Sequence, residues 1–252
     1  MLKKLYDKSN IWFAVVWIVA YCVLMSVADE LSALLGVEKS VTFPIGAVLS
    51  VLLLLFLKKN GLFEEYGLCR SKVPAKKMLF YLPLVVLLSA NFWYGVTLNY
   101  KPIETVLYIL AMFCVGFLEE IIFRGLLFNA MKKSNVTAAI IVSSITFGIG
   151  HIINLINGSG AELVPNLLQV VYATAAGFMF VMMYHKSGSL IGCILTHGLF
   201  NAVSAFANEG AATQEMKILT CVLITVISGG YALYLALAIK KEKEQSIEKE
   251  EV

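Results

Sequence analysis

Ionisable side chains lie at helical spacing inside an apolar segment of this 252-residue sequence. Within residues 103–130, Glu119 and Glu120 are adjacent, and Arg124 follows Glu120 by four positions. Three charges near the centre of a membrane helix cost about 9 kcal/mol, and the apolar residues of this segment offset roughly 7 kcal/mol of that. The charges therefore need partners from other helices, and charge at this depth indicates a functional site.

Helical geometry assigns different tasks to these three residues. Glu120 and Arg124 can pair along one face, which also holds Gly116. Glu119 points about 100° away from that face and has no such partner. We predict that Glu120 and Arg124 form a structural ion pair and that Glu119 is the free carboxylate. The alternative is that all three charges only fix helix packing.

Two of the three histidines lie in other apolar segments. His151 ends a face of small, mildly polar residues, and His197 shares a polar stripe with Asn201. A single histidine in a membrane helix is as often a packing residue as a catalytic one. Two histidines on different helices, beside a third helix that bears a free carboxylate, form a much more specific combination and favour one shared site.

The three patterns Glu119–Arg124, Phe147–His151 and His197–Asn201 match the motifs EExxxR, FxxxH and HxxxN in order and spacing. On these residues the sequence resembles the CPBP family of intramembrane proteases, over about residues 60–205. That family includes type II CAAX prenyl endopeptidases and bacterial proteins linked to bacteriocin processing and self-immunity.

The resemblance implies an endopeptidase that hydrolyses a peptide bond of a membrane-embedded or lipid-associated protein or peptide. It implies catalytic roles for Glu119, His151, His197 and Asn201. Glu119 would be the general base that activates water, assisted by His151. His197 and Asn201 would stabilise the oxyanion, and Glu120 and Arg124 would support the site.

The need for a metal stays open. Glu119, His151 and His197 could hold zinc and leave one coordination position open, as in a metalloprotease. The same residues could act without a metal, which is the slightly preferred interpretation, and no HExxH motif is present. The cofactor is therefore unknown from the sequence.

Two other function classes compete with the protease. A non-catalytic immunity or peptide-binding membrane protein could keep the pocket, although binding alone does not require a free carboxylate beside two imidazoles. A proton-coupled transporter could use the same residues as a relay, but the broken helices and inverted repeats typical of transporters are not evident.

The elements that must position these residues are membrane helices, because the chain is 59% apolar and only 15% charged. We expect an all-α, polytopic transmembrane bundle in one domain, residues 1–252, with a solvated charged tail at 240–252. Its eight spans are residues 10–28, 41–57, 79–99, 103–130, 137–156, 164–185, 189–208 and 217–239.

The distribution of basic residues between the two sides predicts how these spans are oriented in the membrane. With eight spans, sixteen of the twenty lysines and arginines fall on the side of the two termini and only Lys39, Lys101 and Lys217 on the other. Both termini are therefore predicted to be cytoplasmic. We expect a multi-pass protein of a bacterial plasma membrane, with an uncleaved first span. The lipid bilayer and a peptide substrate are its partners, nucleic acid is not, and the oligomeric state stays open.

Overall fold

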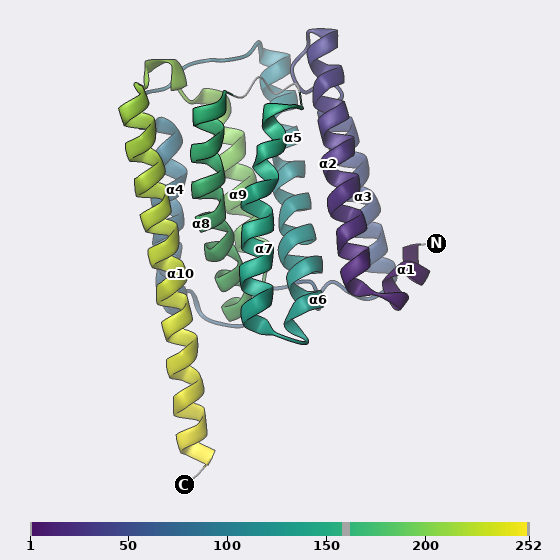
Figure 1. Cartoon of the computed structure of the whole chain (residues 1–252), viewed down its shortest axis with the longest axis vertical. Coiled ribbons are helices and arrows are strands. Elements are labelled where there is room, and N and C mark those ends of the chain that lie inside the picture. Colours follow the sequence, from purple (N-terminus) through teal and green to yellow (C-terminus); the bar gives the residue numbers. More distant parts are fainter. Residues whose placement is uncertain (1, 158–161, 251–252) are drawn as a thin grey trace.

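Helices form all the regular structure of the computed structural model, which describes residues 2–157 and 162–250 and contains no β-strand within them. The long helices run side by side in one bundle (Figure 1). The helices are α1 (Leu2–Lys8), α2 (Asn10–Leu35), α3 (Thr42–Lys59), η1 (Ala75–Tyr81), α4 (Leu82–Ser89), η2 (Ala90–Phe92), α5 (Pro102–Glu119), η3 (Glu120–Phe128), α6 (Asn129–Lys132), α7 (Val136–Gly150), η4 (His151–Leu155), α8 (Leu163–Ser187), α9 (Ile191–Val203), η5 (Ser204–Phe206), η6 (Glu209–Ala211) and α10 (Gln214–Glu250).

The bundle confirms the expected all-α membrane fold. Seven helical segments of the described chain are long and apolar enough to cross a membrane, and the eighth expected span is a shorter apolar helix, Ile191–Phe206. Many leucine and valine side chains on the outer faces of α2, α3, α5, α8 and α10 are exposed. Such faces suit a lipid environment, since they would be unfavourable in water.

Local signals in the sequence set the helix ends. The Ser9 hydroxyl accepts a hydrogen bond from the backbone N–H of Trp12 at the start of α2, and Asn135 caps α7 through the N–H of Ala138. Gly36 ends α2 in the left-handed conformation that glycine adopts without strain. Pro102 starts α5, where its missing N–H would have no helical partner.

The third span is shorter and less regular than the expected continuous helix over 79–99. It begins as the 3₁₀ segment η1, and Leu79, Phe80 and Tyr81 have positive φ angles, so the chain turns before α4 begins. Pro83, in the first turn of α4, is compatible with a helix start and not with a helix interior. Helical structure ends at Phe92, and residues 93–99 form a connector with a turn at Gly95.

Two close helix contacts depend on glycine. A Cβ atom on Gly116 of α5 would lie 2.5 Å from the backbone nitrogen of Gly198 on α9. A Cβ atom on Gly177 of α8 would lie 2.9 Å from the carbonyl oxygen of Ser144 on α7. Small residues let membrane helices approach closely in this way. The α5–α9 contact lies one turn from Glu119 and Glu120, so it fixes their distance from His197.

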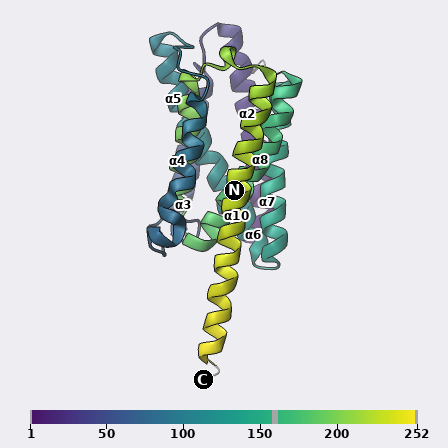
Figure 2. The same cartoon turned by 90° about the vertical axis from the view of Figure 1, so that its left-hand side faces the viewer.

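Both described ends of the chain lie at the lower end of the bundle, where α1 packs beside the start of α2 and α10 extends downwards (Figures 1 and 2). The charged part of α10 continues as helix to Glu250, with exposed side chains through Lys249. Glu242 fastens this helix to the bundle, because its carboxylate contacts Lys77 at 2.8 Å and Lys186 at 3.1 Å. Connectors 36–41, 93–101 and 207–213 lie at the opposite, upper end.

Candidate active site

The fourth span changes its helical form at the residues that could do chemistry. The sequence predicts one regular helix over 103–130, whereas the structure has α-helix to Glu119, π-helix from Glu120 to Phe128 and a last α-helical turn. All nine residues of the π-helical segment are buried. Most π-helices are single-turn bulges, and they occur frequently at functional sites. Here the wider turn begins at the residue that binds both Arg124 and His197.

The imidazole of His197 on α9 lies between the two consecutive carboxylates. Its Nδ1 is 2.8 Å from Oε1 of Glu120, and its Nε2 is 3.4 Å from Oε2 of Glu119. The Glu120 carboxylate, fully buried beside Arg124, accepts the Nδ1–H and so sets the orientation of the ring. Glu120 therefore positions a histidine as well as pairing with an arginine, a role that the sequence did not indicate.

The predicted ion pair between Glu120 and Arg124 is present. Nη1 of Arg124 lies 3.0 Å from Oε1 of Glu120, and both side chains are fully buried. The guanidinium carbon is 4.0 Å from the ring centroid of Phe147, and that ring also meets His151 and His197 edge-on. Stacking over an aromatic face stabilises a desolvated cation. The phenylalanine of the FxxxH pattern thus contacts the arginine of the EExxxR pattern.

The Glu119 carboxylate has one oxygen held and one without a hydrogen bond. The Tyr21 hydroxyl on α2 donates to Oε1 of Glu119 at 2.6 Å. Oε2 of Glu119 has no hydrogen-bond partner in the described part of the chain. Sequence reasoning missed Tyr21, which lies in a span without a recognisable motif. The available signal was weak: a tyrosine deep in an apolar helix needs a partner for its hydroxyl.

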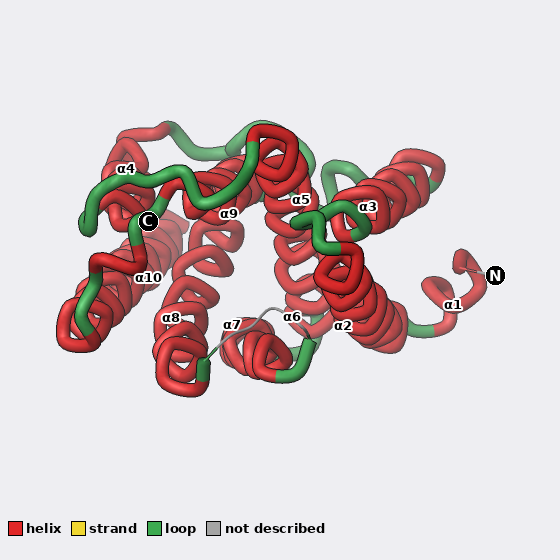
Figure 3. The backbone as a smooth tube through the Cα atoms, turned by 90° about the horizontal axis from the view of Figure 1, so that it is seen from above, coloured by secondary structure: helices red, strands yellow, loops and turns green. Residues whose placement is uncertain are grey.

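A cavity of about 450 Å³ lies above this cluster, between the upper parts of α2, α5, α7, α8, α9 and α10. Tyr21, Glu119, His151 and Asn201 all line it, whereas His197 lies behind Glu119 and does not. Figure 3 shows the helices from above, with α9 and α5 on one side of the bundle and α8 and α7 on the other. The volume is within the range of about 300–1,000 Å³ typical of small-ligand sites.

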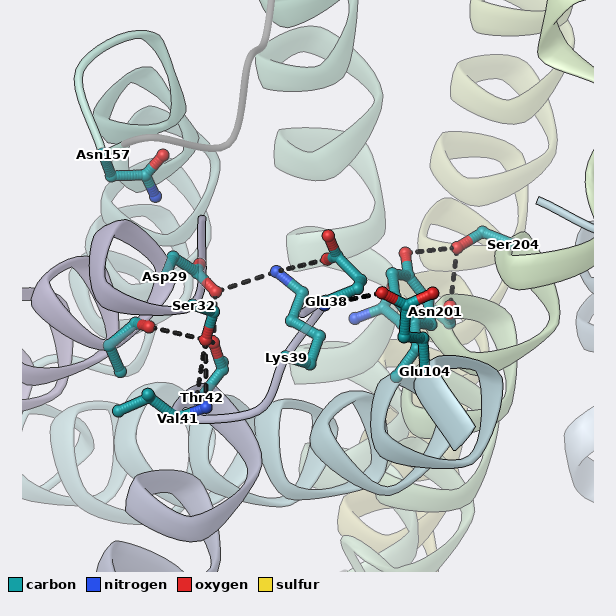
Figure 4. A network of polar contacts seen from close by, with 12 residues as sticks. Asp29, Ser32, Glu38, Lys39, Val41, Thr42, Glu104, Asn157, Asn201 and Ser204 are labelled. Carbon is teal, nitrogen blue, oxygen red and sulfur yellow. Dashed lines mark hydrogen bonds and ion pairs between the residues drawn. The ribbon is translucent and has the colours of Figure 1, made fainter. Parts of the chain in front are cut away.

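Polar contacts continue along the wall towards the upper end (Figure 4). The Lys39 amine pairs with Asp29 at 2.8 Å and with Glu38 at 3.6 Å, and the Ser204 hydroxyl donates to the backbone carbonyl of Asn201. Burial lowers the pKa of Lys39, but the Asp29 carboxylate outweighs this effect, and the net shift is upwards. Lys39 therefore stays charged at neutral pH and balances Asp29 in the upper part of the cavity.

The structure joins Glu119, Glu120, Arg124 and His197 by direct contacts, and it places His151 and Asn201 on the wall of the cavity that Glu119 also lines. His151 ends α7, lines the cavity and packs its ring edge-on against Phe147 at 5.3 Å. No hydrogen bond joins its side chain to Glu119 within the described residues.

The residues offered for zinc do not form a ligand set. In the described ranges, no group of three histidine, cysteine, aspartate or glutamate side chains is arranged to hold a metal ion. Both ring nitrogens of His197 already face carboxylates, and Nδ1 is bound to the oxygen that also pairs with Arg124. The imidazole of His197 is therefore held between two carboxylates.

Comparison with known proteins agrees with these motifs. Residues 101–203 match the family model described as "Type II CAAX prenyl endopeptidase Rce1-like". The match contains Glu119, Glu120, Arg124, and the two histidines and the asparagine of the site, but not Tyr21. No curated protein and no solved structure gives a significant match. Over this central segment, less than half of its length, the chain is similar to the Rce1-like type II CAAX prenyl endopeptidases, which are membrane proteases, and its described part holds seven helical segments long and apolar enough for a multi-pass membrane protein.

Proposed function

We propose that this protein hydrolyses a peptide bond of a membrane-embedded or lipid-associated peptide at Glu119, in the plasma membrane of a bacterial cell. One observation carries the proposal: Glu119 lines the cavity, the Tyr21 hydroxyl holds its Oε1, and Nε2 of His197 lies 3.4 Å from its buried Oε2. A carboxylate held in this way at the wall of a cavity, away from bulk water, is suited to take a proton from a bound water molecule.

The proposed reaction uses the neighbouring groups in turn. His151, on the adjacent wall of the cavity, orients a water molecule. Glu119 removes a proton from this water as the water oxygen bonds to the carbonyl carbon of the substrate. The amide of Asn201, on the wall of the cavity, donates to the oxyanion of the tetrahedral intermediate, and His197 holds Glu119 from behind. The C–N bond then breaks, and Glu119 passes its proton to the leaving amine nitrogen. No step requires a metal ion.

Glu120 and Arg124 support this reaction without touching the substrate. The Glu120 carboxylate holds Nδ1 of His197, and Arg124 balances the charge of Glu120 in a site that excludes bulk water. Removing one such partner would alter the position of the imidazole behind Glu119. Both residues are therefore proposed as positioning residues.

The test is hydrolysis by the full-length protein in liposomes, with membrane peptides extracted from its own cells as the substrate mixture. Digestion in H₂¹⁸O followed by mass spectrometry identifies new C-termini that contain the heavy oxygen. Glu119→Gln should abolish these products, while Glu244→Gln, the same change on the exposed tail of α10, should leave them unchanged. Equal product formation by wild type and Glu119→Gln would refute the proposed base.

A further inference from the structure

The residues that line the cavity above Glu119 belong to the upper part of the bundle. Its lining on α2 runs from Tyr21 up to Asp29, and its lining on α10 belongs to the first turns, from Lys217 to Ile224. The upper connectors contribute Lys39 and Glu209. No lining residue comes from the lower connectors 60–74, 132–135 and 188–190, all of which are described.

Below Glu119 the bundle is closed by packed side chains. Ile122, Arg124 and Phe128 are fully buried on η3, and Met179 and Phe180 of α8 pack at the same level. Arg124 fills the space between Phe147 and Phe180, at 4.0 and 5.6 Å from the two ring centroids. Water and substrate therefore reach Glu119 from the upper end.

The two ends carry opposite charge. The lower end holds sixteen lysines and arginines and, among the residues that the structure describes, seven acidic residues. The upper end holds three lysines and seven acidic residues, among them Asp29, Glu38, Glu104 and Glu209. Basic residues in short connectors stay on the cytoplasmic side of a membrane. The lower end is thus assigned to the cytoplasm, and the mouth of the cavity to the opposite side.

We infer that the protein cleaves its substrate from the non-cytoplasmic side of the membrane. This inference depends on the proposed function and adds a substrate class: membrane-anchored peptides whose scissile bond lies in the outer half of the bilayer or just outside it. The uncharged polar wall, with Asn91, Gln169, Asn201 and Tyr94, offers donors and acceptors to an extended peptide backbone. A peptide would enter this site only after its own insertion or export.

The side from which the cavity opens can be measured by thiol labelling. Two conservative variants, S26C in the cavity wall and S71C in the exposed lower connector, are made in a chain whose five natural cysteines have been replaced. A charged, membrane-impermeant thiol reagent is applied to sealed right-side-out and inverted membrane vesicles. We expect S26C to react only in right-side-out vesicles and S71C only in inverted ones. The reverse pattern would overturn the inference.

The substrate class is tested separately in cells. New peptide termini that are present with wild type and lost with Glu119→Gln are mapped by mass spectrometry onto the membrane topology of their parent proteins. We expect these sites in non-cytoplasmic segments or the outer half of spans. Sites on the cytoplasmic side would overturn this inference and leave the hydrolase intact, whereas no Glu119-dependent site at all would refute the proposed function itself.

Discussion

Removal of the negative charge at Glu120 tests how the site is held together. In Glu120→Gln the shape is kept, but Arg124 loses its only hydrogen-bonded carboxylate among the described residues while remaining fully buried. Breaking a buried pair on one side costs about 3–5 kcal/mol. The contact of Arg124 with Phe147 persists, so we expect the lower value, about 3 kcal/mol. At about 1.4 kcal/mol per factor of ten, this loss of stability raises the equilibrium constant for opening of the helix bundle roughly a hundredfold.

The buried thiol of Cys193 on α9 can report this change. With the other four cysteines replaced, its labelling rate in mild detergent, relative to the unfolded chain, measures how often the bundle opens. We expect labelling of Glu120→Gln to be about a hundredfold faster than wild type. The double variant Glu120→Gln with Arg124→Met removes both charges and should restore protection to within about tenfold, since no charge is then left unpaired.

A matched exposed change, Glu244→Gln, should leave the labelling of Cys193 unchanged. The reasoning would be refuted if Glu120→Gln protected Cys193 as well as wild type does, or if the double variant opened more readily than the single one. Either result would mean that the buried ion pair does not stabilise the contact between η3 and α9.

Four further predictions follow from the site. Exchanging the two charges, Glu120→Arg with Arg124→Glu, should keep more folded protein than either single change but lose peptide cleavage, because a cation would face Nδ1 of His197; cleavage at the wild-type rate would contradict this role. Tyr21→Phe should lower kcat by about ten- to a hundredfold with unchanged abundance, the range for a hydrogen bond to a charged group, and an unchanged kcat would remove Tyr21 from the mechanism. Gly116→Ala should reduce the yield of folded protein, because its Cβ would meet the backbone of Gly198, while Gly229→Ala, with no atom within 4 Å, should not; equal yields in a gel-filtration assay would contradict the close helix contact. Cleavage in liposomes should persist after treatment with a zinc chelator, and chelator-sensitive cleavage that zinc restores would argue for a metal mechanism.

Helix content and the Glu120–Arg124 pair were predictable because they depend on local spacing. Long apolar runs must form helices in lipid, where each backbone polar group needs an internal partner. Residues four apart on a helix meet whatever surrounds them. The shortened third span was less accessible to sequence reasoning, since the turn at Leu79–Tyr81 occurs within an apolar run and only Pro83 indicates it.

The amino-acid sequence by itself determined the membrane fold and the candidate residues on three helices, because apolar periodicity and intramembrane charge are properties of single segments. Tertiary structure alone decided that His197 lies between Glu119 and Glu120, that Tyr21 from a distant span holds the Glu119 carboxylate, and that the cavity lies in the upper part of the bundle. These features arise from contacts between helices, where the distance set by Gly116 and Gly198 and the packing of Arg124 against Phe147 are not encoded in any one segment.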